Sequence, residues 1–197
     1  ILRCLVGSEM CIRDSGVRKI RVTGGEPLIR RGVTDLFTGL GELPNLETLA
    51  LTTNASQLAD MAPRLRDAGV NSVNISLDSL QAPRFKVITR TGDLDRVLEG
   101  IDAAIAQGID RIRLNVVVLD GLNRDEVLPL TQFALAKNIH ISFIEEMPLG
   151  QVNVGGKPLA YVSSDALQAE LSEHFCLEPL SAEAVSYTHL TLPTNGC

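Results

Sequence analysis

The sequence predicts an α/β fold built on a parallel sheet, and it favours a partial (β/α) TIM-like barrel over an open sheet. Strand-like and helix-like segments alternate along the middle of the chain, a pattern typical of parallel sheets. Polar or special residues follow the apolar run of each predicted strand, and in a barrel these strand ends converge on one mouth. An open doubly wound sheet, the alternative, would need such residues only at its switch point. The strands are too few to close a full barrel, so we expect a partial or truncated one.

Length and composition exclude several classes of protein. With 197 residues, 45% of them hydrophobic and 21% charged, the chain can form one globular domain with a sizeable core. Its formal net charge of −6 creates no overall field that would attract nucleic acid or a membrane. No apolar run approaches the roughly 18 residues that span a bilayer. The four cysteines do not form a disulfide framework, so we expect a cytoplasmic protein.

The two ends of the chain differ in character from its middle. Residues 1–15 and 186–197 show neither strand alternation nor a helical period, and residues 1–15 do not form a convincing signal peptide. Both ends resemble translated adapter sequence. We therefore predict that 1–15 and 186–197 are non-native and that a single domain covers 16–185.

Five segments with strand-like patterns define the predicted sheet. The first covers 20–23 and ends at Thr23-Gly24-Gly25-Glu26-Pro27, where the glycines leave the backbone open to close approach and the proline ends the strand. Alternation puts Ser76 and Asp78 on one face of the third strand. The other four strands are expected at 48–53, 74–77, 111–118 and 139–144.

Apolar residues at helical spacing predict the helices. The helix at 58–68 ends before Gly69, a natural residue for a helix C-terminus. Asn54 either begins a turn or caps that helix, and the cap is the favoured interpretation. Further helices are expected at 33–40, at 94–106, at 123–136 with Asn123 as a possible N-cap, and from Ser163 or Ser164 to about residue 174.

The turn after the first strand is the first candidate binding element. It presents backbone N–H and C=O groups beside the carboxylate of Glu26, which suits a ligand carrying both an ammonium and a carboxylate. An ordinary βα turn is the alternative. Ser76 and Asp78 would face a barrel interior, which is costly unless they are paired or bind a ligand; a local hydrogen-bond network is the alternative.

Cations on the strands indicate a polyanionic ligand, phosphate above all. Arg21 lies on the first strand, and Arg111 and Arg113 share one face of the fourth. The alternative is a solvated face, or salt bridges to one of three carboxylates, Glu26, Asp78 or Glu145.

Two further residues near the fifth strand are candidate ligand contacts. Met147 lies outside any periodic apolar stripe, which favours a flexible apolar wall for a flat ligand. His140 alternates with isoleucines and is interpreted as structural. The sequence contains no Ser-His-Asp arrangement, paired glycosidase acids, Walker loop or metal-ligand spacing. It therefore predicts neither a catalytic side chain nor a metal ligand.

The serial order of five motifs carries a family resemblance that covers nearly all of residues 16–180. The motifs are 20–28 (IRVTGGEPL), 52–54 (TTN), 74–80 (NISLDSL), 113–117 (RLNVV) and 143–150 (FIEEMPLG). In this order and spacing they closely resemble the GTP 3′,8-cyclase family (molybdenum cofactor biosynthesis protein A) of the radical S-adenosylmethionine enzymes. Gly-Gly-Glu-Pro alone marks only that superfamily.

The resemblance implies a fold, an activity and cofactors. The family has a partial (β/α) barrel, so this chain would be a barrel of the radical S-adenosylmethionine type, truncated at both ends. Family members are lyases of molybdenum cofactor (molybdopterin) biosynthesis that convert GTP to (8S)-3′,8-cyclo-7,8-dihydroguanosine 5′-triphosphate. They use S-adenosylmethionine and two 4Fe–4S clusters. A homodimer and functional coupling to the next enzyme of the pathway are also expected.

Carried over by position, the resemblance also assigns ligand contacts. Three positions match residues that contact S-adenosylmethionine: Gly25, Ser76 and Met147. Three match residues that contact GTP: Arg21, Thr52 and Arg113. The family has lysine where Arg113 stands and usually arginine where Ser142 stands.

The family's cluster cysteines have no counterpart in this sequence. Cys4 and Cys11 do not substitute for the first set, and Cys176 is interpreted as structural. The resemblance therefore implies that this chain assembles neither cluster and is inactive as a fragment. The alternatives are another radical S-adenosylmethionine enzyme, for example in peptide maturation, and a non-catalytic nucleotide-binding barrel.

Overall fold

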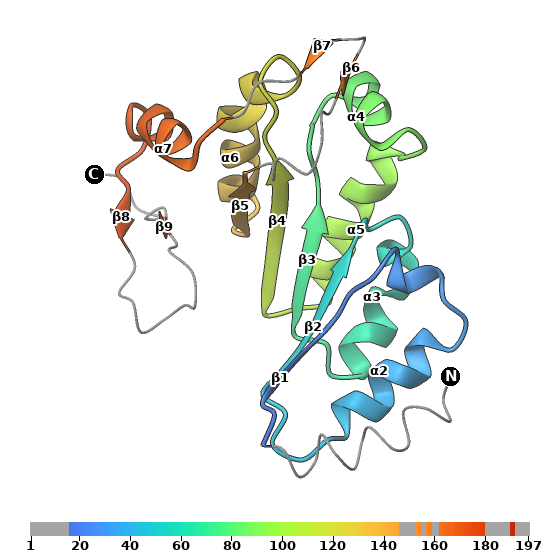
Figure 1. Ribbon diagram of the computed structural model, residues 1–197. Helices are drawn as coiled ribbons and strands as arrows, with labels where there is room; N and C mark the ends of the chain where they lie inside the picture. The colour runs from blue at the N-terminus through green and yellow to red at the C-terminus, as the bar shows by residue number, and fades with distance from the viewer. Residues whose placement is uncertain (1–15, 146–152, 155–156, 159–161, 180–189, 192–197) are drawn as a thin grey trace.

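A parallel sheet of five strands forms the centre of the molecule (Figure 1). The computed structural model describes residues 16–145, 153–154, 157–158, 162–179 and 190–191. The strands are β1 (Lys19–Val22), β2 (Thr48–Thr53), β3 (Ser72–Ser76), β4 (Arg111–Val117) and β5 (His140–Ile144). Their order in the sheet is their order in the chain. Since parallel crossovers are right-handed, this order sends each connecting helix to the same face, as in a barrel wall. The predicted partial barrel is confirmed, and the doubly wound alternative is wrong.

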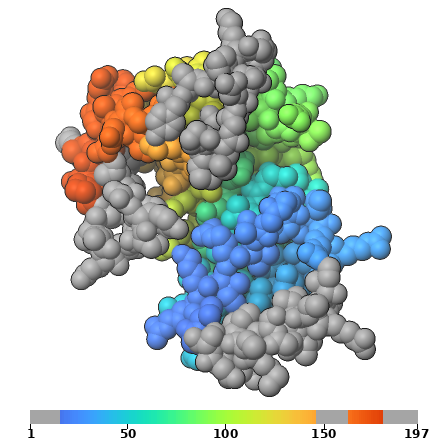
Figure 2. Space-filling view, in the orientation of Figure 1, coloured from blue at the N-terminus to red at the C-terminus, as the bar shows by residue number. Residues whose placement is uncertain are grey.

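The helices connect these strands and extend beyond them. They are α2 (Val33–Gly41), α3 (Leu58–Asp67), α4 (Ala82–Thr89), α5 (Leu94–Ala106), α6 (Val127–Ala136) and α7 (Ser164–Ser172), with short 3-10 helices η1 (Pro27–Ile29) and η2 (Arg124–Glu126). Two small antiparallel pairs follow, β6 (Asn153–Val154) with β7 (Lys157–Pro158), and β8 (Glu178–Pro179) with β9 (Leu190–Thr191). Figure 2 shows α7 (orange) and the first βα unit (blue) on opposite sides of the molecule. In the described part of the chain, no helix is long and apolar enough to cross a membrane.

The core lies between one face of the sheet and the helices. Alternate strand residues such as Leu51, Ile75 and Leu114 are fully buried there, because the period of two sends them all to the same side. Fully buried helix residues, among them Leu65 and Ile101, belong to the same core cluster. Burial of this aliphatic surface, at about 25 cal/mol per Å², is the main source of stability.

Most element predictions are confirmed, and the exceptions have local causes. The strand at 48–53 and the helix at 94–106 match β2 and α5. Strand β3 begins two residues earlier than expected, because Ser72 pairs with Ala50 of β2. Helix α4 was not predicted, since only Phe85 of its residues is buried and its pattern is weakly amphipathic.

Two predicted asparagine caps are wrong. The Asn54 side chain accepts a hydrogen bond from Ser56 N at 2.9 Å, so it forms an Asx turn, and α3 begins after Gln57 without a side-chain cap. Asn123 is buried and does not cap the helical segment after it. Its side chain instead accepts from Leu119 N at 2.8 Å and donates to Asp78 O at 2.8 Å and Val117 O at 2.9 Å. Asn123 therefore ties the ends of β3 and β4 together.

The other predicted cap is confirmed. Ser163 Oγ accepts from Ala166 N at 3.2 Å at the start of α7, as expected of a serine N-cap. The helix ends at Ser172, slightly before the predicted boundary.

Candidate polyanion-binding face and glycine turn

The face of the sheet opposite the helices is polar. Thr52 pairs with Asn74, Asn74 with Arg113, and Arg113 with His140, so these residues form one row across four strands. Residues paired in parallel strands point to the same face of the sheet. None of the four belongs to the buried core. His140 is exposed and lies beside Arg113 on this face.

Two more polar rows lie on the same face. Toward the carboxyl ends of the strands, Ser76 pairs with Asn115, and Asn115 with Ser142. Toward the amino ends, the row consists of Arg21, Ala50, Ser72 and Arg111. The sequence predicts polar residues at the strand ends. In the structure, polar residues also occur along the length of the strands on this face.

This face is positively charged in a chain whose formal net charge is −6. Strands β1 to β5 contain no aspartate or glutamate. The basic residues of these strands all occupy the alternate positions that form the polar face. They are Lys19, Arg21, Arg111, Arg113 and His140. A cationic surface of this kind favours a polyanion.

Three arginines come close together on this face. Burial of the Arg113 side chain lowers its pKa from the ordinary value, and the nearby charges of Arg111 and Arg21 lower it further. Arg21 Nη1 also donates to Thr52 Oγ1 at 3.4 Å. The structure therefore brings together Arg21, Thr52 and Arg113, the residues predicted to contact GTP, and adds Arg111.

Glu26 does not neutralise these arginines. Its Oε1 accepts from Thr53 Oγ1 at 2.7 Å and from Leu28 N at 3.0 Å, and its Oε2 accepts from Asn54 N at 2.6 Å. The carboxylate thus fastens the end of β1 to the end of β2. In the described residues no ion pair joins Glu26 to Arg21, so the salt bridge proposed between them is wrong.

Asp78 belongs to a local hydrogen-bond network, which was the alternative to a ligand contact. Its Oδ1 accepts from Val117 N at 2.8 Å, which links the end of β3 to the end of β4. Burial raises the pKa of Asp78 above its ordinary 3.8, and the hydrogen bond from Val117 opposes that rise. Ser76, by contrast, is exposed on the polar face at the last position of β3.

The two glycines after β1 have different structural roles. Gly24 has φ 145°, a conformation that side chains rarely adopt, so glycine is needed there for the backbone. Gly25 has no such φ, and a Cβ added to it would meet nothing within 4 Å. Neither conformation nor packing therefore requires glycine at 25. Close approach of a ligand to the exposed backbone gives a physical reason for it.

Comparison with known proteins agrees with this geometry. Residues 9–134 match the family profile of the Radical SAM superfamily. The chain belongs to the radical SAM superfamily. The superfamily assignment rests on the stretch that includes the glycine turn and strands β1 to β4.

The most similar relatives of this radical SAM chain include several bacterial cyclases. The "GTP 3′,8-cyclase" of Pseudomonas entomophila is 52% identical over 162 residues, covering 82% of this chain and 48% of the relative. That of Ectopseudomonas mendocina is 54% identical, covering 82% and 49%. "GTP 3′,8-cyclase 2" of Pseudomonas aeruginosa is 49% identical, covering 86% and 51%. The chain thus spans about half the length of the curated relatives it matches.

Solved structures show the same fold at low sequence identity. Streptococcus suis SuiB matches with a TM-score of 0.63 at 18% identity, covering 86% of this chain and 39% of SuiB. TYW1 with a lysine–pyruvate adduct matches with a TM-score of 0.59 at 16% identity, covering 91% of this chain and 61% of that one. These likenesses support the partial-barrel fold alone.

Met147, the third predicted S-adenosylmethionine contact of the radical SAM chain, lies outside the described residues, as do Cys4 and Cys11. Cys176 is exposed. The described residues contain no group of three or more His, Cys, Asp or Glu side chains that could hold a metal. The described residues therefore do not supply an iron–sulfur ligand set.

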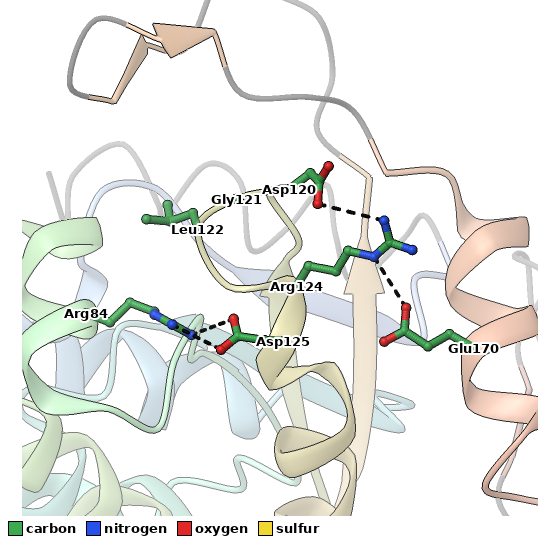
Figure 3. Close-up of a pocket in the computed structure, with 7 residues that line it drawn as sticks. All are labelled: Arg84, Asp120, Gly121, Leu122, Arg124, Asp125 and Glu170. Carbon is green, nitrogen blue, oxygen red and sulfur yellow. Dashed lines mark hydrogen bonds and ion pairs between the residues drawn. The ribbon is translucent and has the colours of Figure 1, made fainter.

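A pocket of about 440 Å³ lies away from the polar face, between the α4 and η2 region and α7 (Figure 3). Its lining residues are Arg84, Asp120, Gly121, Leu122, Arg124, Asp125 and Glu170. Arg84 donates to both oxygens of Asp125, at 2.8 and 3.1 Å, and Arg124 pairs with Glu170 at 3.3 Å and Asp120 at 3.7 Å. Both guanidiniums are thus paired, and the contact with Glu170 attaches α7 to η2. Sequence reasoning missed this pocket because its residues are far apart in the chain.

Glu126 beneath this pocket is a buried structural acid. Its side chain is 2% exposed. It accepts from Ser79 Oγ at 2.7 Å, Leu80 N at 2.6 Å and Arg84 Nη1 at 2.6 Å. These contacts hold the loop after β3 against η2 and α4.

Proposed function

We propose that this chain is the central part of a GTP 3′,8-cyclase, a lyase of molybdenum cofactor biosynthesis. The observation that carries the proposal is the acid-free polar face, on which Arg21 contacts Thr52 and Arg113 lies in the row of Thr52. Relatives about half identical to the chain, and named GTP 3′,8-cyclase, support it. A homodimer and coupling to the next pathway enzyme stay predictions.

The polar face would hold the triphosphate of GTP. Arg21 and Arg113 each carry a planar guanidinium that can form two parallel hydrogen bonds to a phosphate. Because Arg113 is half-buried and repelled by its neighbours, a bound polyanion would favour its charged form. Thr52 would add a hydroxyl donor between the cations. The protein would orient GTP by this end of the molecule.

The glycine turn and the end of β3 would hold S-adenosylmethionine. The exposed backbone at Gly25 fits the amino and carboxylate groups of its methionyl end, and the exposed Ser76 hydroxyl lies at the end of β3. Met147, outside the described residues, would contact the adenine. When bound, S-adenosylmethionine would supply the chemistry that removes hydrogen from the ribose. The role of this chain's residues is to place the two ligands at one mouth of the barrel.

Calorimetric titration of the chain with GTP and ATP tests the proposal. We expect GTP to bind more tightly than ATP, and Arg21→Ala to weaken GTP binding about tenfold through loss of charge-assisted hydrogen bonds. Arg18→Ala is the matched control, because Arg18 precedes the same strand but pairs with the exposed Glu47 at 3.1 Å. Equal affinity for GTP and ATP would instead favour the alternative of a general nucleotide-binding barrel. No affinity for either would contradict both.

A further inference from the structure

Arg111 is a cation of the polar face to which the family resemblance assigns no ligand, although its place on the strand suits a polyanion. It is the first residue of β4 and pairs in register with Ser72 of β3. Ser72 pairs with Ala50, and Ala50 with Arg21. Arg111 and Arg21 therefore stand at the two ends of one row. The two residues between them in this row, Ala50 and Ser72, are small and buried.

The acids near Arg111 do not compensate its charge. Asp110, the preceding residue, pairs with Arg66 of α3 at 3.5 Å. In the described part of the chain, neither Arg111 nor Arg21 makes an ion pair, whereas five other arginines do. Those paired arginines are Arg18, Arg66, Arg84, Arg96 and Arg124. Within the described residues, the charges of Arg111 and Arg21 therefore remain uncompensated by an ion pair.

The spacing of the cations suits an extended anion. Arg111 and Arg113 are two residues apart on one strand, about 6.6 Å at the usual rise, and point to the same face. Both the charge of Arg111 and that of Arg21 disfavour the charged form of Arg113, so all three lie within electrostatic reach. An extended anion such as a triphosphate chain is long enough to contact all three cations at once.

We propose that Arg111 binds the distal phosphate of the nucleoside triphosphate whose inner phosphates contact Arg113 and Arg21. The proposal extends the function given above and rests on it for the identity of the nucleotide. Arg111 then makes the face selective for the number of phosphates. A triphosphate would use all three arginines, and a monophosphate would leave Arg111 without a contact.

Titration of the chain and three variants with GTP, GMP and inorganic tripolyphosphate tests this role. Arg111→Ala should weaken GTP and tripolyphosphate binding about tenfold and leave GMP binding within about twofold. Arg111→Lys should recover part of the loss, because it keeps the charge but not the planar fork. Arg66→Ala is the matched control, since Arg66 lies beside Asp110 on the helix side and should change none of the affinities.

The outcomes separate this proposal from the function on which it rests. Equal weakening of GMP and GTP by Arg111→Ala, no weakening, or no binding of tripolyphosphate to the unsubstituted chain would overturn the role of Arg111. A chain that binds ATP as well as GTP, with tripolyphosphate binding still dependent on Arg111, would overturn the cyclase assignment and support the phosphate site. An unchanged thermal unfolding midpoint for Arg111→Ala is expected, because Arg111 is exposed and makes no ion pair in the described residues.

Discussion

Two regions of this molecule hold arginines in opposite ways. On the polar face of the sheet, Arg21 and Arg111 make no ion pair among the described residues, and Arg113 lies close to both. In the pocket beside η2, Arg84 and Arg124 are each held by carboxylates. The paired cations fasten helices and loops to one another. Arg21 and Arg111, which no ion pair compensates among the described residues, are available to a ligand. The pocket is therefore a structural junction, and the sheet face is the candidate binding surface.

The largest expected effect comes from the structural junction. Glu126→Ala removes the partner of Ser79, Leu80 and Arg84 inside the protein, and should lower the free energy of unfolding by about 3–5 kcal/mol. Denaturant unfolding measures it. Asp125→Ala is the control, because Asp125 is exposed and its pairing with Arg84 should contribute about 1 kcal/mol or less. Similar losses for the two variants would contradict the structural role of Glu126.

The glycine turn offers a second comparison of structural and ligand roles. Gly24→Ala should destabilise the fold by about 1 kcal/mol or more, because alanine is strained at positive φ. Gly25→Ala should change stability by no more than about 0.5 kcal/mol, since its Cβ meets nothing. The same Gly25→Ala variant should bind S-adenosylmethionine more weakly than the unsubstituted chain. Thermal unfolding measures the stability of both variants, and calorimetry measures the affinity of Gly25→Ala for S-adenosylmethionine. An unaltered affinity would contradict a ligand role for Gly25.

A smaller effect is expected at Asp78, from its titration. Because burial raises the pKa of Asp78 in the folded protein above its ordinary 3.8, its contribution to stability is full below that value and is lost as pH rises through the raised pKa. Asp78→Asn keeps an oxygen acceptor for Val117 N and removes the charge. We therefore expect the stability of Asp78→Asn relative to the unsubstituted chain to rise between acidic and neutral pH. Urea unfolding at both pH values measures this, and the opposite trend would show that the charged form is favoured.

The smallest effect on the fold is expected on the polar face itself. Arg113→Met should change the free energy of unfolding by less than about 1 kcal/mol, because it replaces a repelled, half-buried cation by an apolar chain of similar length. Chemical unfolding without ligand checks it. A loss as large as that of Glu126→Ala would mean that Arg113 supports the fold, and the comparison between the two regions would fail.

Sequence patterns predicted the sheet well because its strands carry strong apolar alternation and its helices strong apolar faces, as in β2 and α5. They missed α4, whose burial depends on one phenylalanine. They also misassigned Asn54 and Asn123, because a local preference for caps does not reveal the competing partners that tertiary contacts supply.

The candidate site was only partly predictable. Motif order identified Arg21, Thr52 and Arg113, and strand register brought them to one face. The contact of Arg21 with Thr52, and the place of Arg111 in the row of Arg21, emerge only when the strands are paired. The same holds for the pocket, whose residues from α4, η2 and α7 share no local pattern.

The affinity of two matched variants for GTP tests the central distinction most directly. Arg113→Ala removes a guanidinium from the polar face, and Arg124→Ala removes one from the pocket. Titration calorimetry should show GTP affinity reduced about tenfold or more by Arg113→Ala and changed by less than about twofold by Arg124→Ala. Equal affinities of the Arg113→Ala variant and the unsubstituted chain, or a loss confined to Arg124→Ala, would contradict the account.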